Sequence, residues 1–177
     1  RAYAHMYRAG ALQSQNQVAR ALGDSDEAVR LVPGDANLIA NRGAIYGMQG
    51  QLALAQHDLE EALKIDANNM LAIGNLAIIH SRRSEWAESR AMIARGLAIE
   101  PNHVALRSEL CWTGAVSDAN AADALPDCDN AIRISKNDPN NFNSRGLAQF
   151  RAGKFAEAIA DYDRSLEGNA NVGSSWY

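Results

Sequence analysis

Apolar and polar residues recur along this chain in a fixed order. The segments NRGAIYGMQGQLALAQHDLEEALKIDANN (residues 41–69) and SRGLAQFRAGKFAEAIADYDRSLEGNANV (residues 144–172) follow one pattern. Each has Arg-Gly at its second and third positions, a second Gly seven residues after the first, an Ala five residues after that, and a closing bulky residue. The distance between copies is a multiple of about 34 residues, which is typical of repeat architectures. We therefore expect the chain to be built from one repeated pair of helices.

Five copies of the pattern cover nearly the whole chain, and the fourth has one extra residue. Three positions of each copy hold only small side chains, because two antiparallel helices approach closely only where neither presents a large one. The copies span residues 2–35, 36–69, 70–103, 104–138 and 139–172. The small residues are Ala9, Gly43, Ala77, Cys111 and Gly146 at position 8; Ala21, Ala55, Ser89, Ala124 and Ala158 at position 20; and Ala28, Ala62, Gly96, Ala131 and Ser165 at position 27.

Residues that end or begin helices lie at the expected borders. Proline stops a helix, and Asp or Asn caps the next one. The predicted stops are Pro33, Pro101 and Pro139, the predicted caps are Asp35, Asn69, Asn102 and Asn140, and Gly50 and Gly153 mark the turn inside a repeat. A plain helical bundle without repeats is the alternative.

The repeat resembles the tetratricopeptide (TPR) repeat in period and in the order of small and bulky positions. The resemblance implies an all-α fold, a right-handed superhelical solenoid of antiparallel helix pairs, whose first helices line a concave groove. It implies a protein-interaction scaffold that binds an extended peptide or a partner protein. Residues 173–177 place Trp176 where position 4 of a sixth repeat falls. Neither end shows a polar capping helix, so we expect the terminal repeats to favour self-association.

The family's groove positions carry asparagine, apolar and arginine side chains in this chain. An asparagine amide both donates and accepts, so it pairs with a peptide backbone. Apolar and aromatic side chains form pockets, and arginine pairs with carboxylates. The alternatives are local hydrogen bonds for the asparagines, and packing of Trp112 against the next repeat. The predicted contacts are Asn41, Met48, Asn75, Ile78, Arg82, Trp112, Asn143, Phe150 and Arg151. Lysines that grip a carboxyl terminus in one family variant are absent from the matching positions.

Composition and motifs exclude several function classes. The net charge is −4 and the pI about 5.5, so the chain lacks the basic surface that nucleic acid requires. No apolar run is long enough to span a membrane. No phosphate loop or hydrolase motif occurs, and the four histidines have no metal-ligand spacing. We therefore expect no catalysis, cofactor or metal. His80 is interpreted as a packed ring, and Glu60, Glu61, Asp161 and Asp163 as solvated helix faces.

The fourth repeat contains both cysteines, Cys111 and Cys128, on its first and second helices. Both face the partner helix of the same pair, so a disulfide is geometrically plausible. The alternative is two small buried apolar side chains. A nucleophile at Cys111 with His103 is disfavoured, because a buried thiol is inert. Pro126 lies where the second helix should run, so this helix should start late or kink near Leu125. The loop 117–121 should then be longer or looser than its counterparts.

The last two repeats also resemble the C-terminal TPR arrays of bacterial transglutaminase-like proteins. That resemblance implies an exported or periplasmic bacterial protein, with the cytoplasm as the alternative compartment. It also suggests a second function, a structural or oligomerisation appendage of a larger protein whose catalytic domain lies outside this chain.

Overall fold

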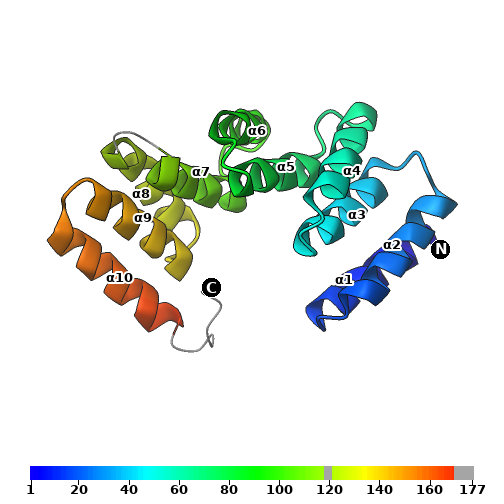
Figure 1. The fold of residues 1–177 in the computed structure, drawn as a ribbon, viewed down its shortest axis with the longest axis horizontal. Helices are drawn as coiled ribbons and strands as arrows, with labels where there is room; N and C mark the ends of the chain where they lie inside the picture. The colour runs from blue at the N-terminus through cyan, green and yellow to red at the C-terminus, as the bar shows by residue number, and fades with distance from the viewer. Residues whose placement is uncertain (118–120, 170–177) are drawn as a thin grey trace. The chain divides into compact units, whose positions relative to one another are not determined.

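The computed structural model describes residues 1–117 and 121–169. In this part of the chain all regular structure is helical, with ten α-helices and one short 3-10 helix (Figure 1). The helices are α1 (Ala2–Ser14), α2 (Val18–Leu31), α3 (Ala36–Met48), α4 (Leu52–Ile65), α5 (Met70–Arg82), α6 (Trp86–Ile99), α7 (Val104–Ser117), α8 (Leu125–Ile134), α9 (Pro139–Arg151) and α10 (Phe155–Asn169), with η1 (Ala121–Ala124) before α8. The odd-numbered helices begin at the residues that open the five predicted repeats.

The chain divides into two compact units, Arg1–Arg83 and Ser84–Tyr177, which we call unit 1 and unit 2. In unit 1, α1 packs against α2 and α3 against α4, while α3 also contacts α1 and α5. In unit 2, α7 packs against α8 and α9 against α10, and α7 contacts α6 and α9. The division falls between α5 and α6, the two helices of the predicted third repeat.

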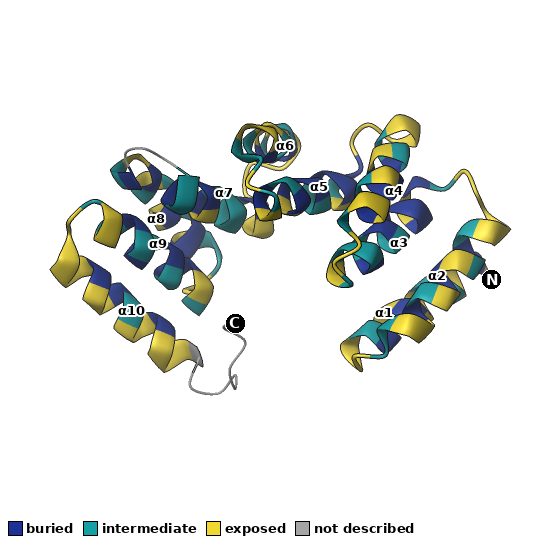
Figure 2. Ribbon diagram, viewed as in Figure 1, coloured by how far each residue is buried: buried dark blue, intermediate teal, exposed yellow. Residues whose placement is uncertain are grey.

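The small residues of the repeat are buried, as the sequence predicts. Figure 2 shows each helix coloured by burial, with buried and exposed residues on different faces. Ala21, Ala55 and Ala62 have no exposed surface, and neither do Cys111 and Ala131. Bulky neighbours complete each interface: Leu59, Ile73 and Ile93 are also buried. Close approach of two helix backbones at a small side chain therefore sets the packing of each pair.

Helix borders follow the predicted signals with three corrections, of which the first is that Pro139, predicted as a stop, is the first residue of α9. The Asp35 carboxylate caps α3, accepting from the amides of Asn37 at 2.9 Å and Leu38 at 3.2 Å. The Asn69 side chain caps α5 by accepting from the Ala72 amide at 3.0 Å. The prediction was wrong for the last two caps. Asp138 caps α9 in place of Asn140, and the ring of His103, in place of Asn102, accepts from the Leu106 amide at 3.4 Å.

The turn inside a repeat requires a left-handed backbone at one residue. Gly50 and Gly153, both predicted at this turn, have φ of 73° and 76°. Glycine adopts this conformation without the steric cost that a Cβ imposes. Asn16 and Ser84 take the same conformation at the equivalent place in the first and third repeats, with φ of 57° and 60°.

The second helix of the fourth repeat starts late, as Pro126 predicts. A 3-10 helix covers Ala121–Ala124, and α8 begins only at Leu125. Pro126 therefore lies in the first turn of α8, where its missing N–H has no helical acceptor to lose. Helix α8 has 10 residues, against 14 in α2, α4 and α6. The predicted irregular loop at 117–121 lies largely outside the described residues.

Two glycines of unit 1 make a matched test of this packing. A Cβ on Gly43 would lie 2.9 Å from Leu59 Cγ and 3.2 Å from the Ala55 carbonyl oxygen, whereas a Cβ on Gly74 would meet nothing within 4 Å. We expect Gly43→Ala to lower the free energy of unfolding by about 1–2 kcal/mol, because Leu59 is buried and must shift. Gly74→Ala should raise it by about 0.5–1 kcal/mol through helix propensity. Urea unfolding followed by far-UV circular dichroism measures both; equal shifts would contradict the packing argument.

Candidate functional site

The first helices of unit 2 enclose a cleft on the predicted groove side. It has a volume of about 560 Å³ and lies between α7 and α9. Asn141 and Ser144 are the buried members of its lining, and the exposed members are Val104, Ala105, Trp112 and Asn140. The lining residues are Val104, Ala105, Ser108, Glu109, Trp112, Asp138, Asn140, Asn141, Asn143 and Ser144.

Two predicted contacts, Trp112 and Asn143, share this cleft. Trp112 is 38% exposed, so a large part of its indole is accessible in the absence of a partner. Asn143 is half-buried, and within residues 1–117 and 121–169 its side chain makes no hydrogen bond. The cleft thus combines an apolar anchor with an amide that has both a donor and an acceptor to offer.

The other two predicted contacts of unit 2 lie near the C-terminus of α9. Phe150 is 54% exposed, and its ring packs edge-on against Phe155 with 5.7 Å between centroids. Arg151 donates through Nη1 to the carbonyl oxygen of Ala115, on the neighbouring helix α7. Neither residue lines the cleft, so the cleft unites only part of the predicted set.

In unit 1 the predicted asparagines are bonded locally. Asn41 Nδ2 donates to the Asn37 carbonyl at 2.9 Å and to Met6 Sδ at 3.3 Å. Asn75 Nδ2 donates to the Leu71 carbonyl at 2.8 Å. Each amide group is therefore held by the preceding turn of its own helix. This orients the side-chain oxygen but leaves fewer donors for a peptide.

The remaining predicted contacts of unit 1 are exposed on α3 and α5. Met48 is 61% exposed and Ile78 is 38% exposed. Arg82 donates to the Gly47 carbonyl at 3.1 Å, the counterpart of the bond from Arg151 to Ala115. Both arginines thus pair with a carbonyl near the C-terminus of the preceding first helix, where a cation is favourable. A ligand carboxylate would have to bind alongside these carbonyl contacts.

The two cysteines lie together inside unit 2. Both are fully buried, their Cα atoms are 4.5 Å apart, and the structure joins their sulfurs at 2.09 Å. They form one apolar cluster with Ala115, Ala124 and Ala131. The bond in solution is a prediction that thiol titration checks.

A repeated ion pair is the feature that our sequence reasoning missed. In three repeats an arginine on the first helix holds, through Nε and Nη2, both oxygens of an aspartate on the second helix. The distances are 2.5 and 2.5 Å for Arg8–Asp24, 2.6 and 2.9 Å for Arg42–Asp58, and 2.6 and 2.7 Å for Arg145–Asp161. We call this contact the Arg–Asp bridge. The constant spacing of sixteen residues was its available signal.

The bridge corrects our interpretation of Asp161 as a solvated carboxylate, because Asp161 is only 3% exposed. Burial of a carboxylate requires a charged partner, and Arg145 supplies it. Arg42 and Arg145 also reach back to an aspartate of the preceding repeat, Asp26 at 3.3 Å and Asp129 at 2.5 Å. The bridge therefore ties three helices together in two places.

The same contacts shift the ionisation of the paired groups. Hydrogen bonding to Arg8, helped by His5, lowers the pKa of Asp24 to about 2 in spite of its burial. Hydrogen bonding to Asp161 raises the pKa of the Arg145 guanidinium, and Asp129 adds to this effect. The Asp24 carboxylate and the Arg145 guanidinium therefore remain charged across the physiological pH range.

Within the described residues, no group of three or more His, Cys, Asp or Glu side chains is placed to hold a metal ion. None of the helices in that part of the chain is long and apolar enough to cross a membrane.

Comparison with known proteins identifies the repeat. Residues 36–69, the predicted second repeat, match the tetratricopeptide repeat family. The fold matches solved structures throughout. A thermophilic TPR protein in Thermus thermophilus has a TM-score of 0.82 at 12% identity over 97% of this chain and 93% of that chain.

MamA (residues 41 to the end) from Desulfovibrio magneticus RS-1 has a TM-score of 0.78 at 13% identity, covering 98% and 97% of the two chains. YrrB, described as a TPR protein with an unusual peptide-binding site, has a TM-score of 0.70 at 17% identity, covering 97% of this chain and 88% of YrrB. No curated protein matches the sequence. The predicted fold class, an all-α TPR solenoid, is therefore confirmed, while nothing tests the transglutaminase-like resemblance.

Proposed function

Because this chain has the tetratricopeptide-repeat fold, we propose that it is a protein-interaction scaffold that binds an extended peptide segment of a partner along its first helices. The observation that carries the proposal is the cleft between α7 and α9, with Trp112 and Asn143 in its lining. A similar fold is solved for YrrB, whose description names a peptide-binding site.

The cleft has the chemistry that a peptide requires. A peptide unit presents one donor and one acceptor, and the Asn143 amide complements both. Trp112 offers a partly exposed aromatic surface of the kind that dominates binding energy at interfaces. Ser108 and Ser144 add hydroxyl groups, and of these the Ser144 hydroxyl already donates to the Asn140 carbonyl at 3.0 Å. A large apolar side chain of the peptide would pack on Trp112, with its backbone bonded to Asn143.

The face of unit 1 contributes apolar surface more than hydrogen bonds in this proposal. Met48 and Ile78 remain exposed, whereas the side-chain amides of Asn41 and Asn75 donate hydrogen bonds to carbonyl oxygens of their own helices. Asn41→Ala and Asn75→Ala should therefore weaken peptide binding less than Asn143→Ala does.

Selection of peptides from a displayed random library tests the proposal. We expect enriched sequences with a large apolar residue, whose synthetic peptides bind the wild-type chain. Trp112→Ala should weaken their affinity at least tenfold, since an aromatic anchor contributes about 2 kcal/mol or more. Asn143→Ala should weaken it about fivefold through a lost hydrogen-bonding partner.

Ile99→Ala is the matched control, because Ile99 is exposed to a similar 39% but lies on α6, a second helix of the repeat. Its affinity should equal that of the wild type. Library selection without enrichment, or peptides that bind the Trp112 variant unchanged, would refute binding at this cleft.

A second candidate function, oligomerisation, is favoured by the outer face of α10. Phe155, Ile159 and Leu166 lie on this face and are 59%, 61% and 69% exposed. The equivalent residues of the second repeat, Leu52 and Leu63, are only partly exposed because α5 follows there. A first helix packed on this face, such as α1 of a second copy, would cover these side chains.

We therefore propose that copies stack end to end, with α1 of one copy against α10 of the next. Sedimentation velocity should show concentration-dependent association that Ile159→Asp abolishes. A wild-type chain that sediments as a strict monomer at high concentration would overturn this candidate and leave the peptide proposal untouched.

A further inference from the structure

The fourth repeat lacks the arginine of the Arg–Asp bridge but keeps the aspartate. The first helix there carries Leu110 at the bridge position, where α1, α3 and α9 carry Arg8, Arg42 and Arg145. The second helix keeps its aspartate, Asp127. In the third repeat both members are apolar, Leu76 and Met92, so no charge remains. The fourth repeat thus retains the acid without its arginine.

Burial supports the assignment of Asp127 to the bridge position. The extra residue of this repeat lies before Ala124, and the residues that follow regain the common pattern. Ala124, Cys128 and Ala131 are 3%, 0% and 0% exposed, as Ala55, Leu59 and Ala62 are at the equivalent places of α4. Asp127 therefore precedes Cys128 as Asp58 precedes Leu59.

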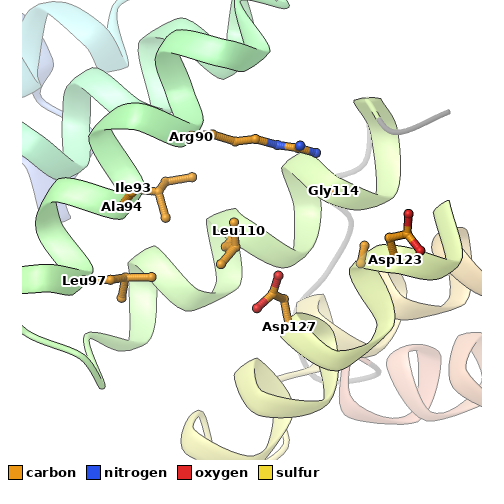
Figure 3. Close-up of a pocket in the computed structure, with 9 residues that line it drawn as sticks. Arg90, Ile93, Ala94, Leu97, Leu110, Gly114, Asp123 and Asp127 are labelled. Carbon is orange, nitrogen blue, oxygen red and sulfur yellow. The ribbon is translucent and has the colours of Figure 1, made fainter. Parts of the chain in front are cut away.

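A cavity of about 450 Å³ lies at this broken bridge (Figure 3). Helices α6 and α7 and the segment from η1 to α8 all contribute to it. The lining residues are Arg90, Ile93, Ala94, Leu97, Leu110, Gly114, Asp123, Ala124 and Asp127. All of them belong to unit 2.

The lining corresponds, position by position, to the intact bridge around Arg42. Leu110 takes the place of Arg42, and Ala94 takes the place of Asp26, which Arg42 also reaches. Gly114 takes the place of Tyr46, whose ring centroid lies 6.0 Å from the Arg42 guanidinium carbon. The cavity therefore occupies the space that an arginine side chain and an aromatic ring fill in the second repeat.

From this correspondence we propose that the cavity receives an arginine side chain of a partner protein, with its guanidinium bonded to Asp127. Asp127 is half-buried and makes no hydrogen bond or ion pair with residues 1–117 or 121–169. A carboxylate placed in this way binds a guanidinium side-on through two parallel N–H···O bonds, as Asp24, Asp58 and Asp161 do.

The walls suit the rest of an arginine side chain. Ile93, Leu97 and Leu110 provide apolar surface for the methylene stem. Asp123 adds a second carboxylate, so the two acids outnumber the one cation of the lining, Arg90. Arg90 donates through Nη2 to Ser117 Oγ at 2.9 Å, and Figure 3 shows its side chain extending toward Gly114. The guanidinium of Arg90 therefore lies at the end of the cavity away from Leu97.

This cavity is separate from the peptide cleft. Leu110 and Gly114 are four residues apart and share one side of α7, whereas Trp112 lies midway between them in sequence. Residues two apart point to nearly opposite sides of a helix. A partner's arginine in the cavity and a peptide on Trp112 would therefore contact opposite sides of α7.

Nα-acetyl-arginine amide is the probe, and Nα-acetyl-citrulline amide, its uncharged isostere, is the control. We expect the arginine probe to shift the amide NMR signals of Gly114 and Asp127 with a dissociation constant of about 1 mM, as a single side chain allows. The citrulline probe should shift them at least tenfold more weakly. Asp127→Asn should abolish the difference between the two probes.

Leu110→Arg provides a second readout, because it restores the bridge within the chain. This variant should no longer respond to the arginine probe, and its unfolding midpoint should rise. Three results would each overturn the proposal. The two probes could shift the signals equally, the arginine probe could cause no shift at concentrations up to 20-fold above the expected dissociation constant, or the Asp127 variant could bind the arginine probe as the wild type does. Trp112→Ala should bind the arginine probe normally, which separates this site from the peptide cleft.

Discussion

Replacing Arg145 with methionine will lower the free energy of unfolding of unit 2 by about 3 kcal/mol. The side chain of Arg145 is 19% exposed, and that of its partner Asp161 only 5%. Removal of one member of a buried ion pair leaves an uncompensated charge in a medium that solvates it poorly. Asp129, which is exposed, will return to solvent at little cost. Unfolding in guanidinium chloride, followed by tryptophan fluorescence, measures the change.

The design of this experiment uses the distribution of tryptophan. All three tryptophans lie in residues 84–177, so their fluorescence reports unit 2 alone. Arg133→Met is the matched control, because Arg133 is exposed on α8 and bonds only to the Asn130 side chain at 2.7 Å among described contacts. Its effect should stay below about 0.5 kcal/mol.

A compensating variant separates the charge from the packing. Arg145→Met combined with Asp161→Leu removes both charges, and we expect it to recover most of the loss, since an apolar pair often replaces a buried ion pair. A double variant as unstable as the single one would show that the packing of the arginine stem, and not the stranded carboxylate, carries the effect.

Reduction of the predicted disulfide between Cys111 and Cys128 will also lower the stability of unit 2 by about 3 kcal/mol. The bond closes a loop with a sequence separation of 17 residues, and loop closure of this length restricts the unfolded chain by that amount. Fluorescence-detected unfolding with and without a phosphine reductant measures the loss. The double variant Cys111→Ser with Cys128→Ser is the control, because the reductant should leave its unfolding curve unchanged.

Thiol titration decides whether the bond exists before that comparison is made. Denatured, unreduced protein should show no free thiol, and reduced protein should show two per chain. Two free thiols in the unreduced sample would mean that Cys111 and Cys128 are simply two buried apolar side chains, and the reductant should then have no effect.

The residues predicted to bind peptide differ in whether their side chains bond within their own helix. Asn41, Asn75 and Asn143 all lie at predicted groove positions, yet only Asn143 keeps both its polar atoms for a ligand within the described structure. The position of a side chain on a helix follows from periodicity. Whether its amide bonds to the preceding turn depends on the side-chain rotamer and on the neighbouring side chains. The sequence periodicity gives no information on either.

The repeat and its helix pairs were predictable from the sequence, because close helix packing requires small residues at fixed spacing. Ala55, Ala62 and Gly43 repeat for a steric reason that acts within one pair of helices. The late start of α8 was predictable for the same kind of reason, since Pro126 acts on its own turn. The caps at Asp138 and His103 show the limit, because neighbouring polar residues competed for each helix end.

Only the tertiary structure decided which charges are buried and where a cavity forms. In the sequence pattern, Asp161 cannot be told from a solvated residue on a helix surface. Only the packing of α9 against α10 brings Arg145 into contact with it. Likewise, Leu110, Gly114 and Ala94 are ordinary residues separately, and they leave room for a side chain only where α6, α7 and α8 bring them together. The sequence by itself determined the elements and their pairing, because local sterics and periodicity act over a few residues. The bridge and the cavity are formed by groups that are far apart in the chain. These groups interact only after the helices have packed together.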